Sequence, residues 1–221
     1  MLKRLVSYFI PVNIYKKKSA VSSSLEVTWN NGQLVLDSQN TNYSYGSLQR
    51  ILRKGLKTIG FDEVLKMNHI LVLGVAGGSV IKTLTDEVKF KGKITGVEID
   101  ADIVEIGNSY FGLNQIPNLE LVIDDAFEFV LKTNLKYDLI IVDIFQDAKM
   151  PAFLFERFFA NRLGFLLNVK GFILFNTMTL NGNHDTRNEE YISGFDRWLF
   201  SVTTIPRVEN HNELIIIQKL G

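Results

Sequence analysis

The chain has 221 residues, 46% of them hydrophobic and 22% charged, which is enough for one large core with a small appendage. Its 24 basic residues balance its 24 acidic residues, so the overall charge favours neither nucleic acid nor an anionic membrane as a partner. The absence of cysteine excludes disulfides, thiol nucleophiles and cysteine-ligated metals.

The N-terminal residues share some features with a targeting sequence. Lys3 and Arg4 precede an apolar stretch, but Pro11 interrupts it after the six residues from Leu5 to Ile10, and no clear small-residue cleavage site follows. No segment approaches the ~20 apolar residues that span a bilayer. We therefore expect a soluble, cytoplasmic protein, with the lysine run at 16–18 in a solvated loop.

The first 40 residues differ in pattern from the rest of the chain. The segments "SLEVTW" and "QLVLD" are typical of two short strands around the tight turn "NNG", because Asn and Gly tolerate positive φ. We predict a small N-terminal β-hairpin element over residues 1–40 and one larger domain over residues 41–221. In that domain, Ser47 can cap a helix over residues 48–60, which ends at Gly60.

Strands and helices alternate from His69 onward. Continuous apolar runs indicate strands buried on both faces, so the fold class is α/β, with a doubly wound, mostly parallel sheet between helices. We also expect a helix over residues 187–200 and a final strand over residues 213–220. The other predicted strands are residues 69–74, 93–99, 119–123, 137–143 and 171–176, and the other predicted helices lie near residues 78–89, 101–112, 125–133 and 153–167.

In such a sheet, ligands bind at the carboxyl ends of the strands, near the point where the strand order reverses. Gly74, Ala76 and Gly78 are spaced G-x-A-x-G directly after a predicted strand and before a helix. Small residues there let the backbone approach a nucleotide closely. The alternative is that the glycines only make a tight strand-to-helix turn.

An acidic residue ends the next predicted strand. Glu98 lies 24 residues after Gly74, where a carboxylate can accept both hydroxyls of a ribose. The alternative is a solvent-exposed carboxylate without a role, which is what we expect of the nearby Asp100 and Asp102. Both of these aspartates lie at the start of the predicted helix over residues 101–112.

Two further strand ends carry aspartates. Asp124 and Asp125 follow the third strand, where one carboxylate can meet an adenine amino group and the other can cap the helix that begins at Ala126. Asp143 ends the most apolar strand, and a partly desolvated carboxylate there can accept a proton from an incoming nucleophile. Asp147, in the loop beyond, can meet charge on a substrate. The alternative for Asp143 is a structural carboxylate that holds this loop.

Other catalytic motifs are missing. The three histidines, His69, His184 and His211, lie on separate elements without metal-ligand spacing, so we expect no metal. The sequence contains neither a G-x-S-x-G elbow nor a G-x-x-x-x-G-K-[ST] loop, so hydrolase and P-loop functions have no support.

Together, "ILVLGVAGGS", "GVEID", "DDAFEF" and "YDLIIVDIF" resemble the spermidine synthase (aminopropyltransferase) family in order and spacing. That family shares its Rossmann-like core with the class I methyltransferases that use S-adenosylmethionine. The segment "LVLDSQNTNYSYGSL" is also similar to the family's link between its β-domain and its core. The resemblance covers residues from about Leu34 to Met178.

The resemblance implies a role for each of these positions. The glycine loop, Gly74 to Gly78 with Ala76 and Gly77, would cradle the nucleoside end of decarboxylated S-adenosylmethionine, a co-substrate. The acid matching Glu98 would bind the ribose, and Asp125 beside Ala126 would read the adenine. Asp143 would deprotonate the acceptor amine, and Tyr45 would contact it. The resemblance also suggests polyamine biosynthesis and a homodimer.

The sequence departs from the family at three places. The family's loop normally reads G-G-G-D-G-G, so Gly77 replaces the acid that would face the donor's free amine. Gly46 and Ser47 follow Tyr45 in place of the usual Gln or His and Glu, and Asp147 lies one residue later than the family's second aspartate. The nucleoside half of the site is thus complete, whereas the polyamine half lacks several anions.

Three functions therefore remain open. The first is aminopropyl transfer to an amine with Asp143 as the base. The second is methyl transfer from ordinary S-adenosylmethionine, which Gly77 favours because no acid would repel the donor's carboxylate; no Asn-Pro-Pro-Tyr stretch supports it. The third is a nucleoside-binding protein that has lost catalysis.

Overall fold

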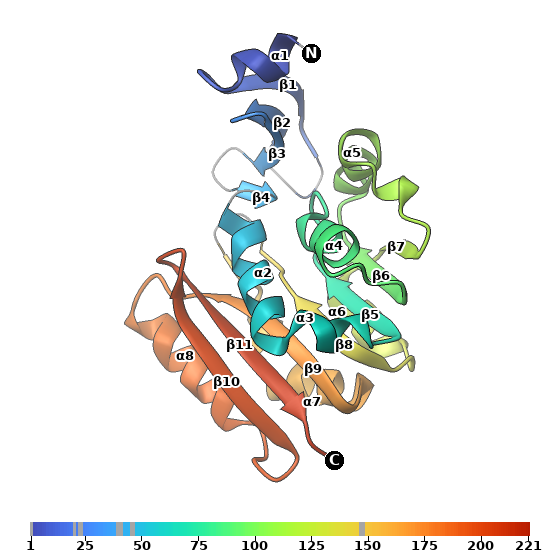
Figure 1. Ribbon diagram of the computed structural model, residues 1–221. Coiled ribbons are helices and arrows are strands. Elements are labelled where there is room, and N and C mark those ends of the chain that lie inside the picture. The colour runs from blue at the N-terminus through green and yellow to red at the C-terminus, as the bar shows by residue number, and fades with distance from the viewer. Residues whose placement is uncertain (1, 20, 22–23, 39–41, 45–46, 146–148) are drawn as a thin grey trace.

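The computed structural model describes residues 2–19, 21, 24–38, 42–44, 47–145 and 149–221. These residues form a four-stranded sheet and a seven-stranded sheet. Figure 1 shows the smaller sheet, in blue, at the N-terminal end of the molecule and the larger sheet between layers of helices. Among the described residues, no helix is long and apolar enough to cross a bilayer.

The N-terminal sheet is larger than the predicted hairpin. The hairpin itself is present, because Asn31 (φ 48°) and Gly32 (φ 75°) make the tight turn between two antiparallel strands. An additional strand pairs on each side, and the last one lies beyond residue 40. The short helix α1 (Leu2–Val6) precedes β1 (Val12–Lys17), β2 (Leu25–Asn30), β3 (Gln33–Ser38) and β4 (Asn42–Ser44), which pair in that order.

Helix α5 (Ala101–Phe111) joins this small sheet to the rest of the molecule. Its Ile103, Ile106 and Phe111 form a buried cluster with Leu25, Val27 and Leu36 of the sheet. Lys17 of β1 pairs with Asp102 of α5 at 2.8 Å, and Lys16 pairs with Glu26 at 2.6 Å. The expectation of a solvated lysine loop was therefore wrong, because β1 extends to Lys17 and opposite charges lie across from it.

Asp100 also differs from expectation. Only 3% of the residue is exposed, and its carboxylate caps α5 by accepting a hydrogen bond from the backbone of Asp102 at 2.9 Å. The hydroxyl of Ser19 donates to the other carboxylate oxygen at 2.5 Å. Asp100 is thus a structural residue that ties the N-terminal segment to α5, because a buried carboxylate needs such donors.

The large sheet has the strand order β10-β11-β9-β8-β5-β6-β7. Its neighbours from β9 to β7 pair in parallel, whereas β11 pairs antiparallel with both β9 and β10. The α/β class and the mostly parallel sheet are therefore confirmed. The strands are β5 (His69–Leu73), β6 (Lys93–Glu98), β7 (Leu119–Ile123), β8 (Tyr137–Val142), β9 (Leu167–Met178), β10 (Phe200–Val208) and β11 (Asn212–Lys219).

Helices cover both faces of this sheet and form two separate cores. On one face, the core includes residues of α2 (Ser47–Ile59), α3 (Phe61–Leu65) and α4 (Ser79–Lys82). On the other face, it includes residues of α6 (Ala126–Lys132), α7 (Arg157–Leu166) and α8 (Gly182–Ser193). Helix α2 lies very close to the sheet, because a Cβ at Gly55 would be 2.5 Å from the side chain of Leu174.

Several predicted helix boundaries were wrong. The helix predicted near residues 78–89 consists of α4 and a π-helical turn (Thr83–Glu87), and the one near residues 153–167 consists of a 3₁₀ turn (Ala152–Phe155) and α7. The helix predicted over residues 187–200 lies earlier, as α8. Helix α2 begins at Ser47 and ends at Ile59, just before Gly60.

Strand β10 was missed altogether. Its β-branched residues, Val202 to Ile205, favour a strand, and the half-buried residues alternate with exposed ones along its first part. Pro206 lies where the pairing with β11 is interrupted, which an edge strand tolerates because no further strand needs the missing N–H. The sequence around Pro206 therefore obscured an edge strand.

Candidate functional site

Four of the predicted site residues lie at one edge of the large sheet. Gly74 follows β5, Glu98 ends β6, Asp125 follows β7 by two residues, and Asp143 follows β8. The pairing aligns these ends, because Leu73 lies opposite both Val97 and Val142. Neighbouring strands are about 4.8 Å apart, so the four ends span roughly 14 Å. The strand order reverses between β5 and β8, which is where doubly wound sheets bind ligands (Figure 1).

The glycine turn after β5 requires its glycines for structural reasons. Gly74 has φ 86°, and a Cβ there would lie 2.2 Å from the backbone oxygen of Asp143. Gly78 has φ 77°, and its N–H donates to the carbonyl of Val75 at 2.8 Å. Ala76 adopts φ 48°, a conformation that favours glycine. The turn thus places backbone without large side chains at the end of β5. This is consistent with a nucleotide-binding loop and also with glycines that only make a tight strand-to-helix turn.

Glu98 holds this turn in place. Its Oε2 accepts hydrogen bonds from the N–H groups of Val75 at 3.1 Å and Ala76 at 3.0 Å, and its Oε1 accepts one from Asp100 at 3.1 Å. The residue is 7% exposed, and burial raises its pKa although the three N–H donors oppose that effect. A carboxylate has about four acceptor positions, so roughly one remains. Binding of both ribose hydroxyls by Glu98 stays a prediction. It requires one of the three N–H hydrogen bonds to Glu98 to be replaced by a bond from a hydroxyl.

Asp125 is the N-cap of α6. Its Oδ1 accepts hydrogen bonds from Phe127 at 2.7 Å and Glu128 at 3.4 Å, so the capping role falls to Asp125, and Asp124 accepts only from the N–H of Asp125 at 2.9 Å. Among the described residues, nothing donates to Oδ2 of Asp125. One oxygen therefore caps the helix beginning at Ala126, and the other is available to a ligand.

Asp143 has a different environment. Its Oδ1 accepts a hydrogen bond from Nδ2 of Asn176 at 2.8 Å, and the residue is partly exposed. Burial raises the pKa of Asp143 to about 6, and the bond from Asn176 offsets only part of that effect. A carboxylate with a pKa near 6 is mostly ionised at pH 7 and binds a proton readily, as a general base must.

Sequence reasoning missed Asn176 and Asn212. Asn176 is fully buried near the end of β9, and its Oδ1 accepts a hydrogen bond from Nδ2 of Asn212 in β11 at 2.9 Å. The available signal was an asparagine after the apolar run "GFILF". Tyr45 and Asp147 lie outside the described residues, and Gly77 lies within the glycine turn.

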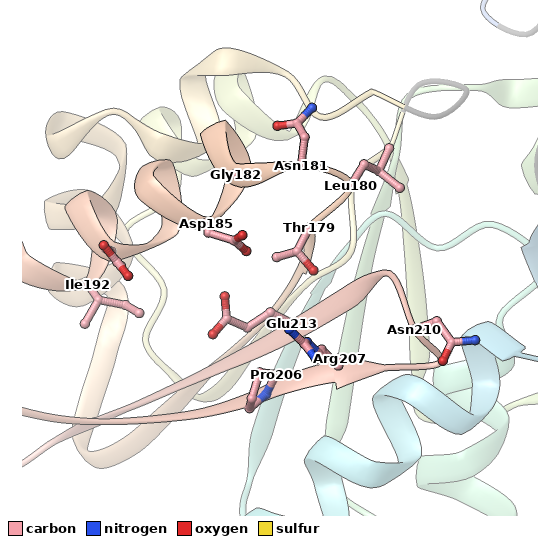
Figure 2. Close-up of a pocket in the computed structure, with 11 residues that line it drawn as sticks. Thr179, Leu180, Asn181, Gly182, Asp185, Ile192, Pro206, Arg207, Asn210 and Glu213 are labelled. Carbon is pink, nitrogen blue, oxygen red and sulfur yellow. The ribbon is translucent and has the colours of Figure 1, made fainter.

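A cavity of about 420 Å³ lies elsewhere, between α8 and the β10–β11 turn. Figure 2 shows Asp185 on the α8 side of this space and Glu213 on the strand side. Asn188 of α8 donates to Glu213 at 2.7 Å and to Thr177 at 2.8 Å. Because Thr177 and Asn176 are consecutive in β9, they face opposite sides of the sheet. The cavity is therefore separate from the Asp143 site. Among the described residues, no group of three or more acidic or histidine side chains could hold a metal ion.

Comparison with known proteins identifies the family. The family model of the spermine/spermidine synthase domain matches residues 50–210, which include all four strand ends. The chain belongs to this family. A polyamine aminopropyltransferase from Vibrio vulnificus is 30% identical over 154 residues, which cover 68% of this chain and 50% of the relative. The chain thus spans about half the length of that relative.

Solved structures of low sequence identity share the fold. Spermidine synthase from Thermotoga maritima superposes with a TM-score of 0.69 at 17% identity, covering 95% of this chain and 73% of that one. Human methyltransferase-like protein 13, in complex with SAH, superposes with a TM-score of 0.65 at 20% identity, covering 80% of this chain and 83% of that one. The Rossmann-like methyltransferase fold expected from the sequence is therefore confirmed.

Proposed function

We propose that this chain is a transferase that binds a donor of the adenosylmethionine type and moves its aminopropyl group to an amine. The observation that carries this proposal is the position of Asp143, a partly exposed carboxylate with one donor among the described residues, beside the glycine turn at the switch point of the sheet. Membership of the spermine/spermidine synthase family supports the same reaction class.

The residues at the strand ends fit the nucleoside part of such a donor. Oδ2 of Asp125 has an unused acceptor position for an exocyclic amino group, and Glu98 has roughly one left for a ribose hydroxyl. Because Gly74 has no side chain, the glycine turn can pack directly against the backbone of Asp143, so the turn and this carboxylate lie side by side. The three positions lie in the order adenine, ribose, reacting carbon along β7, β6 and β5–β8. This order supports a donor that lies across the strand ends.

In the proposed reaction, the donor supplies a sulfonium whose neighbouring carbon is electrophilic. The amine nitrogen forms a bond to that carbon, the carbon–sulfur bond breaks with its electron pair going to sulfur, and the nitrogen loses a proton. Asp143 accepts that proton on its carboxylate, while Asn176 keeps one carboxylate oxygen in place. The remaining oxygen of Asp143 then faces the acceptor.

The nucleoside product tests the proposal. The protein is incubated with an aliphatic diamine and either decarboxylated or ordinary S-adenosylmethionine. We expect methylthioadenosine from the decarboxylated donor, and a rate that falls in Asp143→Asn while methylthioadenosine still raises the melting temperature of the variant. Adenosylhomocysteine from the ordinary donor would instead support methyl transfer, which the absence of an acid at Gly77 favours. Binding without either product would support the non-catalytic alternative.

The N-terminal face supports the expected homodimer. The polar side chains in and just after α1 bond to the small sheet: Arg4 donates to the carbonyl of Gly32 at 3.1 Å, and the hydroxyl of Ser7 accepts from the N–H of Gly32 at 3.0 Å. Leu2, Phe9 and Ile10 are 76%, 89% and 60% exposed. Exposed apolar side chains of this size favour association when they lie together on a surface. We expect Phe9→Ser to lower the mass measured by light scattering, and Trp198→Ser, which alters a distant exposed side chain, to leave it unchanged. The cytoplasmic location stays a prediction.

A further inference from the structure

Asn176 and Asn212 form a chain of two amides that ends on Asp143. Nδ2 of Asn212 donates to Oδ1 of Asn176 at 2.9 Å, and Nδ2 of Asn176 donates to Oδ1 of Asp143 at 2.8 Å. Asn176 is 0% exposed and Asn212 is 8% exposed, so water does not compete freely for these groups. The amide dipoles therefore point in one direction, toward the carboxylate.

The fold brings the two asparagines together from distant parts of the chain. Asn176 lies in the parallel part of the sheet, and Asn212 is the first residue of the antiparallel strand β11. In the register of the two strands, Asn212 lies opposite Met178 and Leu214 lies opposite Asn176, so the two asparagines are diagonal neighbours on one face. This face is the one covered by α2, because Leu174 and Leu214 belong to the same core as α2.

An amide has a donor end and an acceptor end, so its orientation decides what it offers to a neighbour. If the amide of Asn176 turned over, its carbonyl oxygen would face the ionised carboxylate of Asp143, and two acceptors would oppose each other. If Asn212 were removed, the oxygen of Asn176 would be buried without a donor among the described residues. Asn212 thus favours the orientation in which Asn176 donates to Asp143.

We propose that Asn212 is a positioning residue for the proton acceptor of this enzyme, acting through the orientation of the Asn176 amide. The proposal rests on the proposed function, in which Asp143 is the general base. Asn212 has no contact with Asp143 in the structure, so its effect passes through Asn176. Strand β11 therefore supplies part of the support for chemistry that takes place at the end of β8.

Three charged groups on the described elements around the two asparagines, those of Glu98, Glu213 and Arg50, have other partners. The described residues influence the pKa of Asp143 through burial, which raises it, and through the Asn176 bond, which lowers it. Glu98 accepts three backbone N–H bonds, Glu213 faces Asn188 on the opposite side of the sheet, and Arg50 of α2 pairs with Glu209 at 2.7 Å. Loss of the oriented donor should therefore raise the pKa of Asp143.

Two variants test this inference in the full chain. Asn212→Asp keeps the shape of the side chain but offers only acceptors, so it should turn the amide of Asn176 away from Asp143. Asn212→Leu removes the donor without adding charge. The control is Asn188→Leu, because Asn188 is also a buried asparagine that contacts β9 and β11 but faces away from Asp143. Melting temperatures establish that each protein is folded.

The readouts are the titration of the Asp143 carboxyl group, assigned by its absence in Asp143→Asn with infrared or carbon-13 NMR spectra, and the pH profile of kcat/KM. We expect both Asn212 variants to move the midpoint upward from about 6 by about half a pH unit or more, with the larger shift in Asn212→Asp. At pH 6, kcat/KM should fall at least about twofold further than at pH 8.

Three outcomes separate the possibilities. A carboxyl titration that stays at the wild-type midpoint in both folded Asn212 variants, or that shifts equally in Asn188→Leu, overturns the positioning role. A carboxyl titration that shifts while the pH profile of catalysis does not follow it retains the positioning of Asp143 but contradicts its role as the base. If neither Asn212 variant folds, Asn176→Asp in the same assays must raise the midpoint, and an unchanged midpoint also overturns the inference.

Discussion

Two aspartates at opposite ends of strand β8 have similar partners but different environments. Asp138 lies near the amino end and Asp143 just past the carboxyl end. Each accepts a hydrogen bond from an asparagine of β9: Asn168 donates to Asp138 at 2.7 Å, and Asn176 donates to Asp143 at 2.8 Å. The asparagine partner therefore does not by itself distinguish the two carboxylates.

The number of donors distinguishes them. The second oxygen of Asp138 also accepts hydrogen bonds from the N–H groups of Asn68 at 2.7 Å and His69 at 3.1 Å. Burial alone would raise the pKa of Asp138, but these donors hold it below its usual value. Among the described residues, Asp143 has one donor, and burial raises its pKa to about 6. The three donors to Asp138 hold the loop before β5 and favour the ionised carboxylate, whereas Asp143, with fewer donors among the described residues, takes up a proton more readily.

The largest expected difference between the two aspartates is in catalysis. Asp143→Asn should reduce the release of methylthioadenosine by about 100-fold to 10,000-fold, because an amide cannot accept the amine proton. Asp138→Asn should change the rate by less than about threefold, since this side chain lies at the other edge of the sheet. Steady-state assays of the two purified variants check the pair. An equal loss of rate in the two variants would contradict a catalytic role that Asp143 has and Asp138 lacks.

The pH profile of the wild-type enzyme should show the raised pKa directly. Below about pH 6, kcat/KM should fall about tenfold per pH unit, because the protonated form of Asp143 cannot act as a base. A carboxylate with an unperturbed pKa would place that limb near pH 4. The profile is measured from pH 4.5 to 8.5 with an enzyme stability check at each pH. A value of kcat/KM that stays constant down to pH 5 would contradict the assignment of Asp143 as the general base.

The two substitutions should change stability in opposite directions at pH 7. Asp138→Asn should lower the free energy of unfolding by about 1–3 kcal/mol, because the N–H groups of Asn68 and His69 lose their ionised acceptor. Asp143→Asn should raise it by up to about 3 kcal/mol, since the ionised form of Asp143 is the one that burial disfavours. Urea unfolding measures both. A loss of stability in Asp143→Asn would show that its carboxylate is mainly structural.

The smallest expected effect is the pH dependence of these stability differences. The folded pKa of Asp138 is lowered, so its stabilising contribution is present above the unfolded pKa near 3.9 and is lost as the pH falls through the lower folded value. The folded pKa of Asp143 is raised, so its contribution is most favourable below the unfolded pKa and is lost as the pH rises toward about 6. Unfolding of each variant and the wild type between pH 3 and 7 should show opposite trends, and parallel curves would contradict them.

The amino-acid sequence was sufficient to predict which residues lie at the carboxyl ends of three central strands. The apolar runs before Gly74 and Asp143 are strands β5 and β8, and Glu98 ends β6 as expected. Such runs report burial on both faces, which is a local property of the sequence. The exposed edge strand β10 was missed for the same reason, because Pro206 and its polar neighbours lack a continuous apolar signal.

The allocation of hydrogen bonds could not be predicted in this way. The sequence indicates an acid at Glu98 but not that the N–H groups of the glycine turn already occupy much of it. It indicates that Asp124 or Asp125 caps α6 but not which of them, and the structure assigns the cap to Asp125. In each case the answer depends on which donors the surrounding strands bring near the carboxylate.

The sequence by itself determined the class of the sheet, the glycine turn and the strand ends that carry acids, because hydrophobic periodicity and turn residues act over a few positions. Only the tertiary structure decided that Asn212 bonds Asn176, and that, within the described part of the chain, one donor reaches Asp143 whereas three reach Asp138. The physical reason is strand register: residues 36 positions apart become neighbours only when β9 and β11 pair.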